Sequence, residues 1–267
     1  MDTGSAPATP EAAMLTAHEK ERYDRQLRIP QVGEGGQVRL KQAKILIAGA
    51  GGLGAPAAYY LAAAGIGHIR IVDRDRVDLS NLNRQLLHWE KDIGRDKSES
   101  AKEKLSRLNP DVTVETVTSH INEDTISALA ANFDGIIDAL DNFTGRYVLN
   151  KAAATFRIPF FHGAVQGFEG RATTILPGKT ACLACMPRGE SGKAANPIIG
   201  ITPGVIGCIQ AAECIKYLLE QGQLLENRMI VYDGLEMTWK EFTLKTNPQC
   251  PVCGAANRNR HQKGSVP

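Results

Sequence analysis

A glycine-rich segment near the start of the chain has the residue types and spacing needed to hold a phosphate. Gly49, Gly51, Gly52 and Gly54 form a G-x-G-x-x-G pattern between an apolar run and a helix-like segment. Glycines permit a tight turn and let backbone N–H groups approach an anion at the positive end of the helix. Asp73 ends the next apolar run, 19 positions after Gly54, where a carboxylate can bond ribose hydroxyls or cap a turn. Taken alone, these residues predict a dinucleotide-binding dehydrogenase.

Charged and polar residues crowd the segment after Asp73, where a redox enzyme would need an apolar slot for nicotinamide. They are Asp75, Asn81, Arg84, Gln85 and Lys97. Two cations beyond a glycine turn suit a triphosphate, whose chemistry is mostly positioning and charge neutralisation. For Arg84 or Lys97 taken singly, a solvated surface charge is the alternative. As a group, the residues favour a nucleoside triphosphate.

A carboxylate also follows the fourth apolar run of the chain. Asp141 and Asn142 come directly after that run, so they should lie at the carboxyl edge of the predicted sheet, where ligands bind in open α/β folds. Because carboxylate oxygens are preferred Mg²⁺ ligands, Asp141 is a candidate for holding that ion.

Four of the six cysteines form two C-x-x-C pairs, which are Cys182 with Cys185 and Cys250 with Cys253. In a chain without a secretory signal, such pairs are typical of one closed, structural zinc site, and their turn-like surroundings favour this over disulfides or a thioredoxin-like redox pair. The other two, Cys208 and Cys214, lie in an apolar helix-like segment and are expected to pack in the core.

The elements that must position these residues alternate along the chain. Five apolar runs predict strands of a mostly parallel sheet at residues 44–48, 68–73, 111–117, 135–140 and 157–162. Helix-period segments between them predict crossover helices at residues 53–65, 97–110, 123–133 and 144–156, the second with a solvated charged face. A helix at 204–222 and antiparallel strands at 171–177, 228–234 and 239–245 should extend the sheet. The fold class is therefore α/β, with a Rossmann-like doubly wound sheet.

Composition excludes further classes of protein. The 267 residues carry 31 Lys+Arg against 29 Asp+Glu, so a nucleic-acid binder working by bulk charge is excluded. Residues 45–67 hold no charge, but glycines and Pro56 interrupt them, so we expect a buried strand, turn and helix and no membrane partner.

The sequence also predicts the domain organisation. We expect a disordered leader at residues 1–18, a single domain at 19–254 and a flexible tail at 255–267. The cytoplasm is the default location.

The motifs in their order identify a family. Residues 22–26 (RYDRQ), 49–54 (GAGGLG), 80–85 (SNLNRQ), 94–97 (GRDK), 140–142 (LDN) and the two cysteine pairs follow one another within about residues 20–254. Together they resemble the ThiF/MoeB/HesA family of ubiquitin-activating-enzyme-like adenylyltransferases. The resemblance implies a homodimer that uses ATP and Mg²⁺ to adenylate the C-terminal Gly-Gly carboxylate of a ubiquitin-like sulfur-carrier protein, of molybdopterin or thiamine type, and releases pyrophosphate.

The resemblance also implies residue roles. The glycine turn would lie beneath the nucleotide and Asp73 would hold its ribose, while the phosphates would be bound by Arg84 and Lys97 with support from Asn81 and Gln85. Asp141, followed by Asn142, would bind Mg²⁺. Arg25 would reach the phosphates from the partner subunit, and Cys182, Cys185, Cys250 and Cys253 would hold Zn²⁺.

One departure from the family pattern concerns sulfur transfer. Thiamine-branch members place a cysteine in a loop crossing the active site, but no cysteine lies between Cys185 and Cys208, and Lys193 stands about where it would fall. This argues against a covalent step on the enzyme and implies a separate sulfur donor.

There are three alternatives to adenylation of a carrier protein. They are adenylation of a peptide or tRNA-base acceptor, a nicotinamide oxidoreductase, and a non-catalytic subunit, which should have lost Arg84, Lys97 or Asp141.

Overall fold

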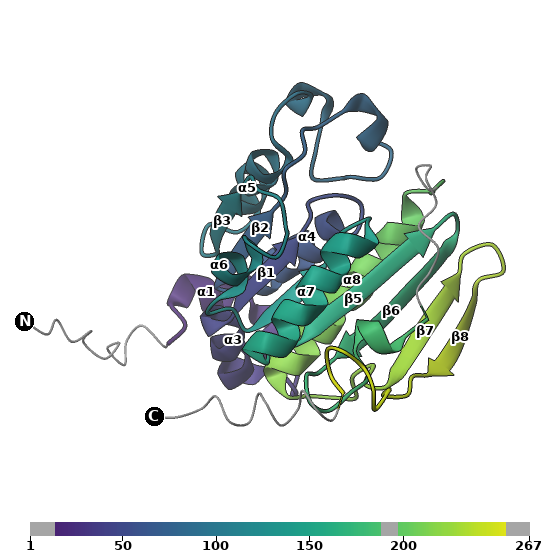
Figure 1. Cartoon of the computed structure of the whole chain (residues 1–267). Helices are drawn as coiled ribbons and strands as arrows, with labels where there is room; N and C mark the ends of the chain where they lie inside the picture. Colours follow the sequence, from purple (N-terminus) through teal and green to yellow (C-terminus); the bar gives the residue numbers. More distant parts are fainter. Residues whose placement is uncertain (1–13, 188–196, 255–267) are drawn as a thin grey trace, which may run out of the picture.

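A parallel sheet forms the centre of the structure, a computed structural model that describes residues 14–187 and 197–254 (Figure 1). Its strands belong to one eight-stranded sheet in the order β3-β2-β1-β4-β5-β6-β7-β8. The parallel strands are β1 (Lys44–Ala48), β2 (His68–Val72), β3 (Thr113–Val117), β4 (Gly135–Asp138) and β5 (Phe160–Gln166). This order confirms the predicted doubly wound sheet and places its switch point, where such folds bind ligands, between β1 and β4.

An antiparallel extension continues the sheet, as predicted. Its strands are β6 (Glu169–Ile175), β7 (Arg228–Asp233) and β8 (Thr238–Thr243). Strand β5 starts later and runs further than the predicted 157–162. The later start arises because Arg157 adopts a left-handed conformation, φ 59°, that ends the preceding helix. The strand then continues to Gln166 because each of its residues pairs with β6.

Helices cover both faces of the parallel strands. One core lies against α4 (Gly54–Ala64), α5 (Lys97–Leu108) and α8 (Ile201–Leu219), and the other against α6 (Ile126–Ala130) and α7 (Phe143–Phe156). In β1, Ile45 and Ile47 face the first core and Leu46 and Ala48 the second, because successive side chains of a strand point to opposite faces. In Figure 1, α7 lies in front of the sheet and α8 behind it.

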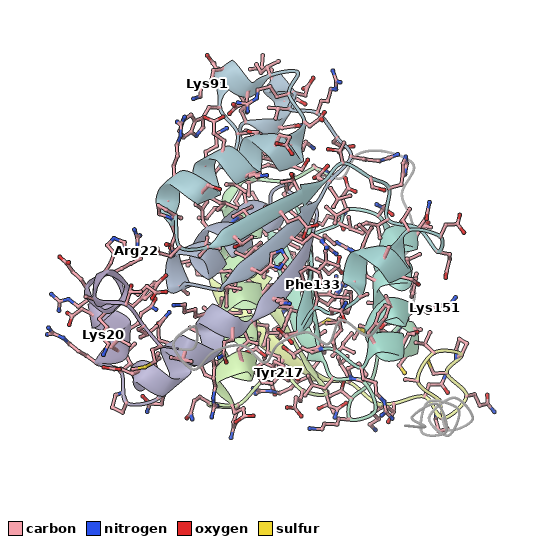
Figure 2. All side chains as sticks on the ribbon, turned by 90° about the vertical axis from the view of Figure 1, so that its left-hand side faces the viewer. Lys20, Arg22, Lys91, Phe133, Lys151 and Tyr217 are labelled. Carbon is pink, nitrogen blue, oxygen red and sulfur yellow. The ribbon has the colours of Figure 1, made fainter. Side chains whose placement is uncertain are left out.

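The charge-free segment 45–67 is a strand, a turn and a helix, as predicted. Among the residues that the structure describes, no helix has the length and hydropathy needed to cross a membrane. Figure 2 shows how side chains are sorted by character: Lys20, Lys91 and Lys151 lie at the outline of the molecule, whereas Phe133 and Tyr217 lie within it.

Two predicted helices differ from their bounds in the structure by three residues or more at an end. Helix α6 is much shorter than the predicted 123–133, because the Asn122 side chain accepts hydrogen bonds from the backbone N–H groups of Asp124 and Thr125 and holds them in a turn. Helix α8 begins three residues before the predicted 204 and ends before 222, because Glu220 turns left-handed with φ 54°.

Three short helices before β1 were missed by the sequence reading. They are α1 (Ala17–Arg22), α2 (Asp24–Leu27) and α3 (Gly33–Gln42). A signal was present, because Thr16 and Glu19 form a reciprocal capping box at the start of α1. The predicted domain boundary at residue 19 therefore falls inside a helix. The rest of the predicted leader, residues 1–13, and the predicted tail lie outside the described residues.

Candidate active site

The glycine turn between β1 and α4 is so tight that two of its glycines have no substitute. Gly49 has φ +104°, and a Cβ there would lie 2.7 Å from the carbonyl oxygen of Ala139. A Cβ on Gly54 would lie 1.9 Å from the carbonyl oxygen of Gly49. The turn therefore packs directly against the loop that follows β4, and this contact brings two predicted parts of the site together.

Asp73, at the end of β2, fixes this turn. Its carboxylate accepts hydrogen bonds from the backbone N–H groups of Ala50, at 2.7 Å, and Asp75, at 2.8 Å. Burial raises the pKa of the Asp73 carboxyl, although both hydrogen bonds favour its charged form. Each carboxylate oxygen keeps a further lone pair, so the predicted ribose contact is compatible with these bonds.

The two predicted phosphate cations have different surroundings. Lys97 is the first residue of α5, and its largely buried ammonium lies 3.1 Å from the carboxylate of Asp75. The Arg84 guanidinium donates to the Ser80 carbonyl and to the Asn83 side chain, both at 2.9 Å. No carboxylate pairs with Arg84 within the described parts of the chain, so its charge is open to an anionic ligand.

Arg84 and Gln85 approach the glycines of the turn. The stem of Arg84 lies 3.6 Å from where a Gly52 Cβ would be, and the buried Gln85 amide lies equally close to Gly51. The Gln85 Oε1 atom is buried and has no hydrogen-bond partner among the described residues. A buried acceptor without a partner costs free energy, so a ligand that donates there would stabilise the site. Asn81, by contrast, accepts from the Asp78 backbone and caps a short 3-10 turn.

The loop after β4 presents one carboxylate to solvent. Asp141 is exposed, and the Asn142 amide, 3.4 Å away, donates to it. Asn142 also accepts from the Gly145 N–H at 2.8 Å and so caps α7, which gives it a structural role beside the predicted nucleotide role. Asp141 makes no ion pair with the described cations. An exposed carboxylate on the loop that packs against the glycine turn has the donor chemistry that Mg²⁺ requires.

A buried polar cluster that the sequence reading missed supports this loop. Asp138 is fully buried at the end of β4 and lies 2.7 Å from His162 Nδ1. Arg146 lies 3.7 Å from the same carboxylate and donates to the Leu140 carbonyl at 2.6 Å, and Gln210 donates to the Asp138 carbonyl. The sequence does hold a signal for this cluster, which is the carboxylate of Asp138 inside an apolar run. A charge that is buried in a strand needs partners nearby. The cluster holds the backbone from which Asp141 projects.

A second buried network contradicts the predicted solvated face of α5. Lys104 is buried and forms an ion pair with Asp92, which is also fully buried. The Lys104 ammonium also donates to Ser100, at 2.7 Å. The expected pairing of Glu103 with Arg107 is present on the outer side of the helix. The loop before α5 therefore covers part of the face that helical periodicity alone would leave in water.

His88 belongs to this network and is held neutral. Burial lowers the pKa of His88 to about 4. The hydrogen bond to the Ala50 backbone acts in the opposite direction and raises this pKa, but its effect is smaller. The charges that face the imidazole are Lys97 and Lys104, which oppose its protonation, and Asp92, which favours it. At neutral pH, His88 therefore carries one N–H donor and one acceptor nitrogen.

We expect acid to destabilise the chain through His88. The unfolded chain binds this proton near pH 6.5 and the folded chain only near pH 4, so the free energy of unfolding should fall as the pH falls between these values. One such group contributes about 1.4 kcal/mol per pH unit in this window. Urea denaturation at several pH values measures the slope, which should be smaller in His88→Gln because the amide does not titrate. Equal slopes would contradict the expectation.

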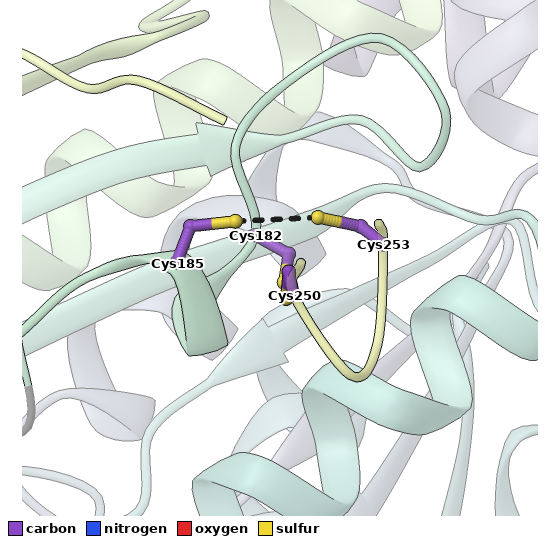
Figure 3. A group of neighbouring side chains, drawn as sticks. All are labelled: Cys182, Cys185, Cys250 and Cys253. Atoms are coloured by element: carbon purple, nitrogen blue, oxygen red, sulfur yellow. Dashed lines mark hydrogen bonds between the residues drawn. The ribbon is translucent and has the colours of Figure 1, made fainter. Parts of the chain in front are cut away.

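The four predicted metal-binding cysteines come together (Figure 3). Their sulfurs all lie within 4.8 Å of one another, with Sγ–Sγ distances of 3.6 Å for Cys182 and Cys250 and 3.3 Å for Cys185 and Cys253. Four sulfurs around one tetrahedral zinc lie about 3.8 Å apart, whereas a disulfide requires about 2.05 Å. All four thiols are free. The donor set and spacing therefore fit zinc.

The zinc-type cluster joins two distant segments of the chain. Cys182 precedes and Cys185 ends a short 3-10 helix (Leu183–Cys185), which is anchored to α7 because the Asn150 side chain accepts from the Leu183 N–H at 2.9 Å. Cys250 and Cys253 follow β8, and the Asn247 N–H donates to the sulfur of Cys185 at 3.4 Å. The cluster packs in the core against α7.

Comparison with known proteins identifies the family. A family model described as the ThiF family matches residues 23–252. The chain belongs to the ThiF family. The SAMP-activating enzyme E1 of Haloferax volcanii is 42% identical to it over 246 residues, which are 90% of this chain and 91% of that protein. The sulfur carrier protein adenylyltransferase of Thermus thermophilus is 39% identical over 250 residues, which are 90% of this chain and 92% of that protein.

A solved structure agrees with this assignment. Escherichia coli MccB with AMPCPP and selenomethionyl MccA has a TM-score of 0.79 and 26% identity, over 87% of this chain and 74% of that one. Membership of the ThiF family confirms the predicted resemblance, and the relatives confirm an enzyme of adenylyltransferase type. The dehydrogenase that the glycine turn suggests by itself is therefore wrong.

Arg25, a predicted phosphate-binding residue, lies apart from the turn in this ThiF-family chain. It lies in α2, whose Gln26 donates to the Ala64 carbonyl at 3.2 Å. Ala64 ends α4, an 11-residue helix about 16 Å long whose other end is the glycine turn. Arg25 is exposed near the far end of this helix, away from the glycine turn of its own chain.

Proposed function

We propose that this chain uses ATP to adenylate the C-terminal Gly-Gly carboxylate of a ubiquitin-like sulfur-carrier protein, releasing pyrophosphate. The proposal is supported by the surroundings of the glycine turn at the switch point of the sheet. Arg84 lies against Gly52, and the loop that bears the exposed Asp141 packs against Gly49. Lys97 pairs with Asp75, whose N–H is bonded to the Asp73 carboxylate that anchors the turn. The proposal is also supported by a relative that is named a sulfur carrier protein adenylyltransferase. A non-catalytic subunit would be expected to lack Arg84, Lys97 or Asp141.

The chemistry explains why this site is cationic. A carboxylate that attacks the α-phosphorus brings two anions together, so positive groups must screen the repulsion and stabilise the leaving pyrophosphate. In our proposal Arg84 and Lys97 do so, Asp73 holds the ribose, and Asn81 and Gln85 support the phosphates. No strong general base is needed, because the attacking carboxylate is already ionised at neutral pH.

Mg²⁺ would be held by Asp141. Bound there, the ion supplies further neutralisation of the triphosphate charge. The chain's own contribution is to fix this carboxylate, because the buried Asp138, His162 and Arg146 cluster holds the loop from below. The same loop touches Gly49, so the carboxylate and the turn keep a constant spacing.

We further propose that the active form is a homodimer in which Arg25 of each subunit completes the other's site. This is supported by the position of Arg25 at the far end of α4, away from its own glycine turn. Mixing an Arg25→Ala chain with an Asp141→Ala chain should restore one intact site per mixed dimer, half the number in an unchanged dimer, whereas each variant alone should be inactive.

ATP–pyrophosphate exchange tests the proposed reaction. Each small Gly-Gly-ending protein of the source organism would be added in turn, with the same protein lacking its last two glycines as the matched control. We expect exchange that depends on one intact carrier. Exchange driven by a peptide or a tRNA, and by no carrier, would overturn the carrier assignment in favour of those acceptors.

The adenylated carrier should form no covalent bond to the enzyme. A covalent intermediate needs an accessible thiolate, and four cysteines are committed to the zinc-type cluster. Burial raises the pKa of the half-buried Cys208 and of the fully buried Cys214. Lys193 lies outside the described residues, and an amine cannot accept sulfur as a thiol does. A separate sulfur donor should therefore attack the adenylate.

Non-reducing electrophoresis with mass spectrometry checks this expectation. Enzyme, ATP, Mg²⁺, carrier and a sulfur source would be mixed and compared with the same mixture lacking ATP. An adduct that reductant or hydroxylamine releases, and that maps to Cys208 or Cys214, would show that the enzyme carries the sulfur step itself.

A further inference from the structure

His88 connects the glycine turn to helix α5. Its Nε2 lies 2.9 Å from the carbonyl oxygen of Ala50, in the middle of the turn, and its Nδ1 lies 3.0 Å from Ser100 Oγ. The neutral imidazole therefore donates to Ala50 and accepts from Ser100. His88 and Ser100 are both buried, at 3% and 0% exposure, so water cannot replace either bond.

Ser100, at the α5 end of this connection, is itself held by neighbouring side chains. Ser100 accepts from the Lys104 ammonium at 2.7 Å, and Lys104 forms its ion pair with Asp92. Asp92 in turn accepts from the Trp89 N–H, at 2.9 Å, next to His88 in sequence. Because Lys104 donates to Ser100 Oγ, the serine keeps its own hydroxyl hydrogen for another acceptor such as His88. Each of these side chains has at least one hydrogen-bond partner, and Asp92 also accepts from Arg95, at 2.7 Å.

Both backbone polar groups of Ala50 are consequently held by side chains. Its N–H donates to Asp73 and its carbonyl accepts from His88. Ala50 lies between Gly49 and Gly51, in the middle of the glycine turn that we propose binds the phosphates. Lys97 begins the same helix that carries Ser100, one turn earlier. His88 therefore couples the glycine turn to the helix that presents the phosphate cation.

We propose that His88 is a positioning residue for ATP: by holding the Ala50 carbonyl against α5, it sets the affinity of the site for the triphosphate. This inference rests on the proposed function, because it assumes that the turn binds ATP. His88 does not touch the nucleotide and takes no part in proton transfer. Since the turn contacts bound ATP before and during the reaction, loosening it should raise KM for ATP and leave kcat nearly unchanged.

Two substitutions of different chemistry test the role. His88→Phe fills the same space without a donor, which leaves the Ala50 carbonyl without its donor and removes one of the partners of Ser100. It should weaken ATP binding about tenfold or more, as expected for an unsatisfied buried acceptor. His88→Gln keeps an N–H donor near the Nε2 position and should stay within about threefold of the unchanged protein.

Titration calorimetry with ATP and Mg²⁺ gives these affinities without a carrier, and pyrophosphate exchange gives KM and kcat. Thr180→Val is the matched control, because Thr180 is buried and accepts from the Leu176 N–H at 2.9 Å, outside this network. It should lower the melting temperature without changing ATP affinity. Ser100→Ala should weaken binding less than His88→Phe, since the donor to Ala50 is retained.

The outcomes separate this inference from the function on which it rests. If the unchanged protein does not bind ATP, the proposed function fails and the inference fails with it. If the unchanged protein binds ATP and His88→Phe binds it equally well, the inference alone is overturned. Equal losses in His88→Gln and His88→Phe that follow equal drops in melting temperature would assign His88 a merely structural role and overturn it too.

Discussion

Replacing Asp141 with alanine should lower carrier-dependent pyrophosphate exchange by a factor of about 10² to 10³ while the chain stays folded. The carboxylate is exposed and contributes little packing, so its loss should shift the melting temperature only slightly. It is also the proposed Mg²⁺ ligand beside the glycine turn, so the charge of the triphosphate would lose part of its neutralisation. Exchange and thermal unfolding should be measured on the same preparations.

Two further variants make the result specific. Asp141→Asn keeps the size of the side chain and removes its charge, so it should be nearly as inactive as Asp141→Ala. Asp124→Ala removes another exposed carboxylate, at the loop before α6, and should leave exchange unchanged. Near-normal exchange by Asp141→Ala would refute the assignment of this residue.

Removal of zinc should have the largest effect on stability. The four sulfurs join the segment after β6 to the segment after β8, so the free energy of binding the metal becomes free energy of folding. We expect one zinc per chain, and a loss of several kcal/mol of unfolding free energy when Cys250 is changed to serine. Because a whole domain is stable by only about 5–15 kcal/mol, such a loss should be evident as a large drop in melting temperature.

Elemental analysis of protein purified without chelators measures the metal content, and thiol titration gives the complementary count. Cys208→Ser is the matched control, because this half-buried cysteine lies outside the cluster and should retain full zinc content. Protein without metal, in which the four cluster thiols react freely yet the melting temperature is unchanged, would contradict a structural zinc site.

Much of the fold could be predicted because its signals are local. Apolar runs bounded by glycine or proline marked each parallel strand, and the glycine turn marked the start of α4. Prediction failed where a nearby side chain competed with periodicity, as when Asn122 held the start of the expected helix in a turn. It also failed for α1 to α3, whose short lengths leave little periodicity to read.

Some residues of the candidate site could also be predicted from the sequence, and others could not. Residues in contiguous motifs, such as Arg84 and Lys97, could be found because the order of the motifs is specific. The supporting groups could not, since His88, Ser100 and Lys104 acquire meaning only when the loop before α5 folds over that helix. Burial of Lys104 is set by this tertiary contact and not by its place in the helix.

The most direct test of the central claim is to follow the two ends of ATP separately. The chain would be incubated with an intact Gly-Gly carrier, Mg²⁺ and ATP labelled in either the α- or the γ-phosphate, and the carrier analysed by intact-mass spectrometry. Our account predicts that the α-label and the mass of one adenylyl group appear on the carrier's C-terminus, while the γ-label leaves as pyrophosphate. Release of the γ-label as orthophosphate with an unmodified carrier would contradict it.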